Sequence, residues 1–344
     1  MSPTQTQVAA SAAIDPDAEI AALERLRSAL QATLDSMQVT VIGQHETLRL
    51  LMTGLIAGGH VLLEGPPGVG KTLMVRSLGN VTGLSFSRVQ FTPDLMPADI
   101  VGAMVLVPDD EGRNRLEFRK GPVFAQLLLA DEINRATPRT QSALLEAMQE
   151  GTVSAGGESM PLPKPFFVLA TQNPIEMEGT YSLPEAQIDR FLFRIDVPYP
   201  SAEMLADILA ATTGATIAEQ VQTITPEEII ELQHLVRSVP LAEPLRNAVA
   251  QFCLTTQPGS EQATKDVRKF IRFGISPRGA QAMVLAAKAN ALLVGRNHVA
   301  VDDLRAILLP VARHRVQLNF EGRAADVDVD ALLHDIFAQT IGRL

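Results

Sequence analysis

The sequence contains no tryptophan, a single cysteine and few aromatic residues, which make up 4% of its 344 positions. One cysteine excludes an internal disulfide, so we expect a reducing, cytoplasmic setting. That residue, Cys253, lies in an apolar stretch and is expected to be a small buried hydrophobe. No unbroken apolar run reaches the roughly 20 residues that a membrane helix requires. No Lys or Arg precedes Arg25, so we expect neither a secretory signal nor membrane insertion.

Positive charge is also in deficit. The 29 Lys and Arg residues are outnumbered by 39 Asp and Glu residues, which gives a formal net charge of −10. Non-specific affinity for nucleic acid comes mainly from neutralisation of phosphates by basic side chains, so nucleic-acid binding is disfavoured, although a local basic channel remains compatible with this charge. A hydrophobic fraction of 46% with 20% charged residues describes a globular protein, and the length suits two domains.

The glycine-rich segment 65–72 is the feature around which the chain is organised. It reads GPPGVGKT, follows the apolar run 61–63 and precedes a helix-forming segment. A strand that ends in such a turn and opens a helix presents backbone N–H groups and the positive end of the helix dipole to a phosphate. The segment therefore predicts a phosphate cradle; an ordinary strand-to-helix turn is the alternative.

Within this cradle, Lys71 is placed to reach the β- and γ-phosphates of a nucleotide triphosphate, and the Thr72 hydroxyl to ligate Mg²⁺. An ordinary turn would give Lys71 no purpose. The predicted nucleotide-binding residues of this segment are Gly65, Pro66, Pro67, Gly68, Val69, Gly70, Lys71, Thr72 and Leu73.

Polar residues follow two further apolar runs. Asp131 and Glu132 end the run 127–130, about 60 residues after the cradle. There Asp131 is expected to hold Mg²⁺, directly or through water, and Glu132 to deprotonate the attacking water as a general base. Asn173, which follows the run 166–170, is expected to hydrogen-bond the γ-phosphate or the water. The alternatives are a solvated strand end for the carboxylates and a turn residue before proline for Asn173.

Alternating short apolar strands and helices up to about residue 197 predict a parallel sheet covered on both faces. Beyond Pro198-Tyr199-Pro200 only helices are expected. This divides the chain into a mobile tail (1–14), an α/β core (15–199) and a helical lid (200–344). The expected strands are 61–63, 86–91, 127–130, 166–170 and 193–197, the expected hairpins 103–119 and 152–162, and the expected lid helix starts Ser201, Thr225, Ser276 and Asp302.

Together these segments resemble an AAA+ ATPase, and more closely its MoxR family. The resemblance covers most of residues 41–200, and beyond them it lies chiefly at SPR 276–278. It implies a P-loop core with a five-stranded parallel sheet and two hairpin inserts near a central pore, followed by an all-α lid. The matching stretches are VIGQ 41–44, FTPDLMPADI 91–100, GPVF 121–124, DEINRA 131–136, QSALLEAM 141–148, ATQNP 170–174 and EAQIDRF 185–191.

The same resemblance implies roles for further residues. Such proteins form rings, usually hexamers, in which one arginine acts on the γ-phosphate of the neighbouring subunit, and Arg190 matches that finger. An ion pair with Asp189 or Glu185 is the alternative. Arg278 matches the second sensor, acting in cis or in trans, unless it is a plain helix-start arginine.

Three less specific features remain. Ile42 and Gly43 match the turn that contacts adenine, although a hydrophobic loop anchor has the same pattern. For Arg135, a contact with a neighbouring subunit and an ion pair within its own subunit are equally compatible with the sequence. Basic residues recur at helical spacing over 265–272, where a site for an acidic partner and a solvated face are both compatible with the pattern.

The expected activity is Mg²⁺-dependent hydrolysis of ATP by a homo-oligomeric, hexameric ring. The resemblance implies a chaperone or remodeller that matures a client, inserts a metal cofactor or assembles a complex, working with a von Willebrand factor A domain protein. The alternatives are a ring-shaped motor on DNA, which the charge balance opposes, and a nucleotide switch that does not hydrolyse. The intact set of Lys71, Asp131, Glu132 and Asn173 opposes the second.

Overall fold

The computed structural model describes residues 16–108, 113–155, 157–173, 181, 183–213 and 220–344. The expected tail 1–14 lies outside these residues, as do the tip of the first expected hairpin at 109–112 and Gly156 in the second.

Five strands form the central sheet, as the resemblance implies. All neighbouring strands are parallel. Side chains alternate between two buried clusters, so that Leu63 and Leu129 face one side while Leu62 and Leu128 face the other. Near-continuous apolar strands are typical of a sheet buried on both faces. In spatial order the strands are β2 (Phe86–Gln90), β5 (Leu127–Asp131), β8 (Phe167–Gln172), β1 (Val61–Glu64) and β9 (Phe193–Asp196).

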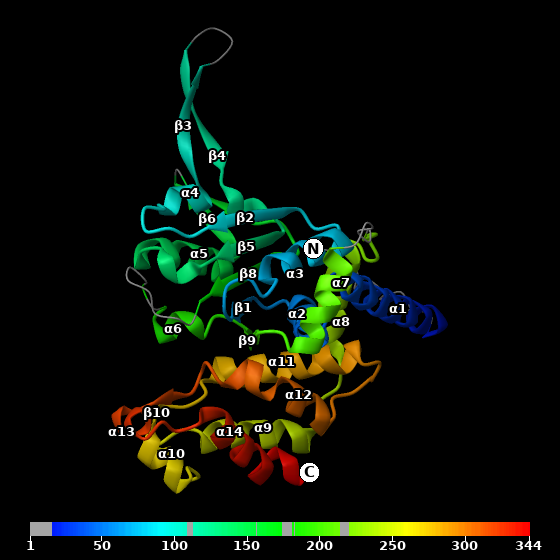
Figure 1. Cartoon of the computed structure of the whole chain (residues 1–344), viewed down its shortest axis with the longest axis vertical. Coiled ribbons are helices and arrows are strands. Elements are labelled where there is room, and N and C mark those ends of the chain that lie inside the picture. Colours follow the sequence, from blue (N-terminus) through cyan, green and yellow to red (C-terminus); the bar gives the residue numbers. More distant parts are fainter. Residues whose placement is uncertain (1–15, 109–112, 156, 174–180, 182, 214–219) are drawn as a thin grey trace, which may run out of the picture.

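Helices cover both faces of this sheet, because each contributes one apolar stripe to a cluster (Figure 1). Leu30, Leu48 and Met74 are buried on the face of Leu63, and Leu144 on the face of Leu62. The first group belongs to α1 (Pro16–Thr40), α2 (His45–Ile56) and α3 (Lys71–Thr82); the second face carries α4 (Pro97–Val101), η1 (Pro122–Phe124), η2 (Ile133–Arg135), α5 (Pro138–Glu150) and α6 (Glu185–Ile188).

Both expected hairpins are present. The antiparallel pair β3 (Gly102–Pro108) and β4 (Asn114–Lys120) extends away from the core, and β6 (Thr152–Ala155) pairs with β7 (Glu158–Pro161) (Figure 1). Gly102 has a φ of 101°, and a Cβ there would lie 2.3 Å from the Arg119 carbonyl oxygen. Only glycine fits this crossing of the two strands at the base of the long hairpin.

The remainder of the chain is mainly helical. Three of its helices begin at predicted starts, and α12 (Val301–Ala312) begins one residue before the predicted start Asp302. The side chains of Ser201, Thr225 and Ser276 each cap a helix N-terminus. These helices are α7 (Ala202–Thr212), α8 (Pro226–Ser238), α9 (Glu243–Thr255), α10 (Lys265–Phe270), α11 (Pro277–Leu293), α12 (Val301–Ala312), α13 (Phe320–Ala324), α14 (Val329–Gln339) and η3 (Ile341–Arg343).

One feature of this part was not expected. A short antiparallel ladder joins β10 (Ile271–Phe273) to β11 (Gln317–Leu318), so the helical lid also contains two strands. Each has only two or three residues, too few for a period-two pattern to show in the sequence.

Cys253 is buried as expected, and this burial raises the pKa of its thiol to about 12. Among the helices of the described residues, none has both the length and the apolar character needed to cross a membrane.

Candidate nucleotide site

The cradle connects β1 to α3 through glycines that the backbone requires. Gly68 and Gly70 have φ of 83° and 84°, in the left-handed region that other residues rarely adopt. No atom lies within 4 Å of a Cβ built at either position, so conformation rather than space demands glycine there. Gly65 differs, because a Cβ there would lie 2.4 Å from the Val197 carbonyl oxygen. The cradle is therefore held close to the end of β9.

The polar residues predicted from separate segments meet at one cavity. It has a volume of about 350 Å³ and lies at the carboxyl ends of β5 and β8, beside the start of α3. Its lining comprises Pro67, Gly68, Gly70, Lys71, Thr72, Leu73, Asp131, Glu132, Thr171 and Asn173. The cradle lysine and hydroxyl, the two carboxylates and the asparagine thus face the same space.

Lys71 is the cation of this cavity. Its ammonium donates a hydrogen bond to the Gly65 carbonyl oxygen at 2.6 Å. Burial lowers the pKa of Lys71, and the carboxylates of Asp131, Glu132 and Glu64 oppose that fall. The Lys71 ammonium is therefore held by a carbonyl oxygen of the cradle, and three carboxylates favour its charged form.

Thr171 links the two carboxylate residues and was given no role in the sequence analysis. Its hydroxyl donates to Asp131 Oδ1 at 2.6 Å and accepts from the backbone N–H of Glu132 at 2.8 Å. The side chain is buried at the end of β8, next to β5. A hydroxyl residue two positions before Asn173, at the end of a buried strand, is the signal that was available in the sequence.

Glu132 has a strained backbone and shares its carboxylate with two partners. Its φ of 54° is unusual for a residue with a side chain, and such strain collects at functional sites. Its Oε2 accepts from Gln90 at 3.0 Å and pairs with Arg135 at 2.8 Å. Arg135 thus makes an internal ion pair with the expected general base, which was one of the two roles considered for it.

Arg88 was missed by the sequence analysis. It lies on β2, and its guanidinium pairs with Asp131 Oδ2 at 2.6 Å. The Thr72 hydroxyl and the Asp131 carboxylate, which line the same cavity, are the hard oxygen donors that Mg²⁺ prefers. The donor set fits this ion, and Arg88 supplies a positive charge to the same carboxylate.

An apolar cavity of about 250 Å³ adjoins the phosphate side through the shared residues Gly68, Gly70 and Leu73. Ile42 and Val41 line it from one side, and Leu205 of α7 is also part of its lining. Its character suits a nucleotide base. Residues on both sides of the expected domain boundary therefore contribute to it.

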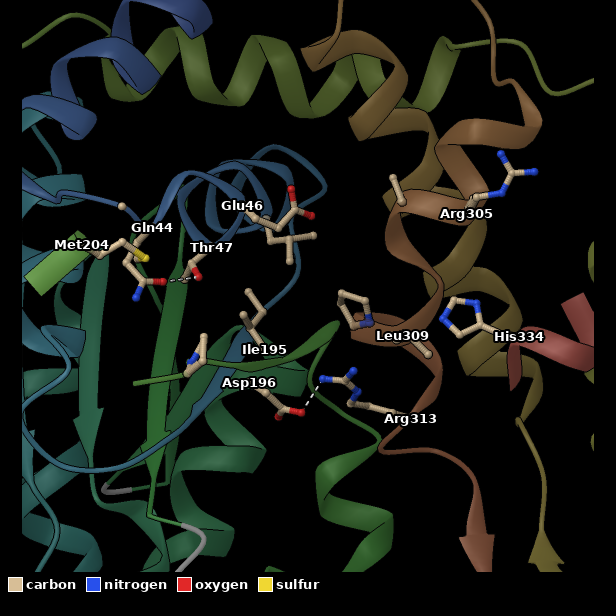
Figure 2. A pocket seen from close by; sticks show the side chains of 15 residues that line it. Gln44, Glu46, Thr47, Ile195, Asp196, Met204, Arg305, Leu309, Arg313 and His334 are labelled. Carbon is tan, nitrogen blue, oxygen red and sulfur yellow. Dashed lines mark hydrogen bonds and ion pairs between the residues drawn. The ribbon is translucent and has the colours of Figure 1, made fainter. Parts of the chain in front are cut away.

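Gly43 fixes the turn beside this cavity. It has a φ of 74°, and a Cβ there would lie 2.5 Å from Met204 Cε of α7. The same glycine and Met204 line a further cavity of about 470 Å³ between α2, β9 and the helices α12 and α14 (Figure 2). Arg313, which also lines this second cavity, forms an ion pair with Asp196 of β9. The lid thus contacts the core next to the expected base site, since Gln44 lines both cavities.

The two arginines assigned by resemblance lie elsewhere. The described residues that line the phosphate cavity do not include Arg190 or Arg278. Arg190 donates from Nη1 to the Leu145 carbonyl oxygen of α5 at 2.9 Å, and Arg278 is exposed in the first turn of α11. The structure does not bring either into the site of its own subunit.

Comparison with protein families gives two matches. Residues 60–193 match the family described as "ATPase family associated with various cellular activities (AAA)", and residues 263–336 match the "AAA lid domain". The first range contains the cradle, Asp131, Glu132 and Asn173; the second contains Arg278.

Similar proteins extend the match to nearly the whole chain. "Chaperone MoxR1" of Mycobacterium tuberculosis is 40% identical over 91% of this chain and 81% of its own length. "Uncharacterized protein YeaC" of Bacillus subtilis is 39% identical, covering 92% of this chain and 95% of that protein. "Protein MoxR" of Paracoccus denitrificans is 38% identical over 87% and 91% respectively. The crystal structure of a suspected ATPase from Cytophaga hutchinsonii matches with a TM-score of 0.87 at 35% identity, covering 93% of this chain and 97% of that one.

Proposed function

Since the chain belongs to the MoxR family of AAA+ ATPases, we propose that it hydrolyses ATP to ADP and phosphate in a hexameric ring and uses the cycle to remodel a client protein. One observation carries the proposal. Lys71, Thr72, Asp131, Glu132 and Asn173 line one cavity, which continues into an apolar cavity of suitable size for a base. ATP would therefore place its phosphates on the cradle and its adenine against Ile42 and Leu205.

The residues divide the reaction among them. The cradle N–H groups and Lys71 bind the β- and γ-phosphates, and Glu132 takes the proton from the attacking water. Asn173 orients that water or the γ-phosphate through its amide. Mg²⁺, when bound by Thr72 and Asp131, would neutralise charge on the phosphate oxygens. Thr171 links the Asp131 carboxylate to the backbone of Glu132 through its two hydrogen bonds.

Arg190 completes the site of the neighbouring subunit in this proposal. An arginine finger neutralises charge that develops in the transition state. Arg278 is exposed at the start of α11 and lies outside the phosphate cavity of its own subunit. This supports a sensor role in which Arg278 contacts the γ-phosphate only after a lid movement, or contacts that of a neighbouring subunit. Its positive charge beside the positive end of the helix dipole is favourable only next to an anion.

The client role rests on the relatives. One of them is named a chaperone, and the net charge of −10 favours protein over nucleic acid as the substrate that is remodelled. We propose maturation, metal-cofactor insertion or complex assembly of a client, together with a protein carrying a von Willebrand factor A domain.

Complementation between inactive variants tests the shared site. Lys71→Ala subunits lack a working cradle but carry Arg190, whereas Arg190→Ala subunits have an intact cradle. We expect phosphate release to be low for each variant alone and partly restored in a 1:1 mixture. The matched control is a mixture of Lys71→Ala and Glu132→Gln. Both substitutions inactivate the cavity of the subunit that carries them, so this mixture should give no restoration. Absence of restoration in the first mixture, with mixed rings verified by mass, would contradict an arginine acting in trans.

A further inference from the structure

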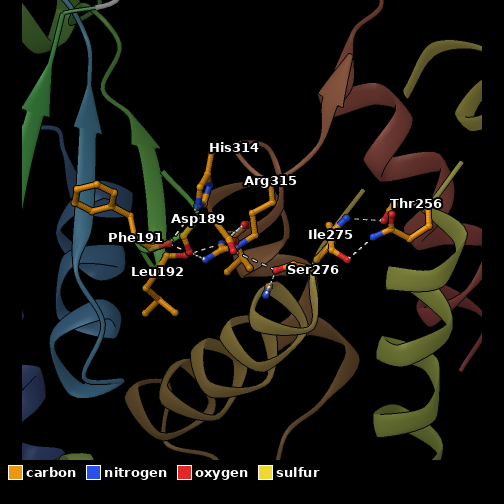
Figure 3. A network of polar contacts seen from close by, with 11 residues as sticks. Asp189, Phe191, Leu192, Thr256, Ile275, Ser276, His314 and Arg315 are labelled. Carbon is orange, nitrogen blue, oxygen red and sulfur yellow. Dashed lines mark hydrogen bonds and ion pairs between the residues drawn. The ribbon is translucent and has the colours of Figure 1, made fainter. Parts of the chain in front are cut away.

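The turn 189–192 contains Arg190 and leads into β9, and three side chains of the lid hold it (Figure 3). Arg315 and His314 follow α12, and Ser276 caps α11. Residues more than 80 positions apart in the chain thus meet at one point beside the proposed finger.

Arg315 is the centre of this contact. Its side chain is only 2% exposed, and its Nε donates to Asp189 Oδ1 at 2.8 Å. Its remaining donors go to carbonyl oxygens of Asp189 at 3.2 Å, Phe191 at 2.7 Å, Leu192 at 3.2 Å and Val311. All five N–H groups of the guanidinium are therefore used, four of them on the turn. A lysine, with three donors on a single nitrogen, could not reproduce this set.

His314 and Ser276 hold the same turn from either side of Arg315. The His314 Nε2 donates to the Phe191 carbonyl oxygen at 3.2 Å, since a carbonyl can only accept. The Ser276 hydroxyl donates to Asp189 Oδ2 at 3.2 Å, so both oxygens of this carboxylate are bound by the lid.

The helix that carries Arg278 is packed against this contact. Ser276 is the N-cap of α11, and Arg278 lies two residues further on. In the first turn of α11, a Cβ at Gly279 would lie 2.7 Å from Arg315 Cδ. The Arg315 side chain therefore packs against the backbone of α11 at Gly279, where a larger residue would collide with it.

We propose that Arg315 is a positioning residue that couples the lid of one subunit to the Arg190 it presents to the next. This inference rests on the proposed shared site. A lid movement displaces Ser276 and Arg315 together, and these hold Asp189, the residue adjacent to Arg190. The nucleotide state of one subunit, sensed by the lid, thus sets the rate of hydrolysis in its neighbour.

The test uses donor subunits whose own site is inactive. The donor carries Lys71→Ala with or without Arg315→Met, the acceptor carries Arg190→Ala, and phosphate release is measured in 1:1 mixtures. We expect the Arg315→Met donor to restore at least about tenfold less activity, because misplacing a catalytic group by about 1 Å can cost up to about 10²-fold. The matched control is an Arg313→Met donor, since Arg313 follows the same helix but pairs with Asp196 and Asp330. That donor should restore activity fully.

A reciprocal mixture separates positioning from general damage. Arg315→Met is placed in the Arg190→Ala acceptor, whose own finger is already absent, and we expect a smaller loss there than in the donor. Equal losses in the two arrangements, or a donor that restores full activity, would overturn the inference while leaving the shared site intact. No restoration by Lys71→Ala alone would overturn both.

A milder variant tests the same inference in case the Arg315→Met protein does not fold. Ser276→Gly removes the hydroxyl bound to Asp189, and glycine is tolerated at helix N-caps. In the donor it should lower restoration by a measurable factor, with light scattering used to confirm that it enters rings as the parent does. Full restoration by this donor, when Arg315→Met cannot be prepared, would overturn the inference.

Discussion

Glu132 combines a left-handed backbone with a carboxylate oxygen that has two partners. In the proposed mechanism a base held in this way is oriented before substrate arrives, and its carboxylate must also accept the proton of the attacking water. Backbone strain together with shared polar contacts is what we expect of a functional residue.

Replacing this base should separate binding from hydrolysis. Glu132→Gln keeps the size and the acceptor for Gln90 but cannot take a proton, so we expect ATP binding near that of the parent and turnover lower by about 10²- to 10⁴-fold. Fluorescent-nucleotide titration and phosphate release measure the two quantities. Glu150→Gln, at the exposed end of α5, is the control and should hydrolyse normally. Normal turnover in Glu132→Gln would assign the base elsewhere.

At the same scale, the sequence predicted the residues that local geometry determines. Lys71 and Thr72 follow a glycine pattern, and Asp131 and Asn173 follow buried strands whose carboxyl ends meet at one edge of a parallel sheet. Arg88 and Arg315 were not predicted as site residues. Arg88 and Arg315 have partners 43 and 126 residues away, respectively, and no spacing rule connects such pairs.

At the scale of elements, short apolar runs predicted the five core strands, and turn-rich segments between extended ones predicted both hairpins. The order β2-β5-β8-β1-β9 could not be read from those runs, because the central strands β5, β8 and β1 are all mainly apolar and each fits any central position. The ladder β10–β11 was missed for the opposite reason, since strands this short carry too few residues for a pattern. The bounds of the core strands agree within about two residues, the accuracy expected of helix and strand ends.

Ion pairs join elements across the core and lid. Glu64, at the end of β1, pairs with Arg194 of β9 at 2.5 Å, and Arg194 also contacts Asp196. Asp196 pairs in turn with Arg313, which reaches Asp330 of α14. Burial raises the pKa of Glu64, and Arg194 opposes this rise. The strand that leads into the cradle is therefore connected to the lid through charges as well as through packing.

His60 ties β8 to α5 and makes stability depend on pH. Its Nδ1 accepts from the Val168 N–H at 3.1 Å and its Nε2 donates to the Met148 carbonyl oxygen at 3.2 Å, a pattern that only the neutral ring satisfies. Burial lowers its pKa to about 4 from 6.5. Because the folded pKa is the lower one, this stabilisation is present above pH 6.5 and is lost as pH falls from 6.5 towards 4.

His60→Gln isolates this contribution, since an amide can accept and donate in the same places without titrating. Between pH 7 and pH 5 the free energy of unfolding should fall by up to about 2 kcal/mol more in the parent than in the variant. Urea unfolding at the two pH values measures the difference. Parallel losses in both proteins would show that another group is responsible.

At the scale of the whole molecule, a shared site requires assembly that responds to nucleotide. With ATP, the Glu132→Gln protein should form rings that light scattering detects as a multiple of the 37.1 kDa chain. Without nucleotide the same protein should show a lower mass, because no phosphates are then bound at the sites between the subunits. A monomer at every ATP concentration would contradict the shared-site mechanism.

Under the coupling proposed here, the contact of Arg315 with Asp189 gives communication around such a ring a direction. A ring of identical subunits is closed by head-to-tail contacts, in which each subunit shows one surface to the neighbour ahead and a different one to the neighbour behind. Under the coupling proposed here, a subunit reports its lid position only to the neighbour that receives its Arg190. Hydrolysis would then travel around the ring in a single sense, and the direction would be a property of each protomer rather than of the client.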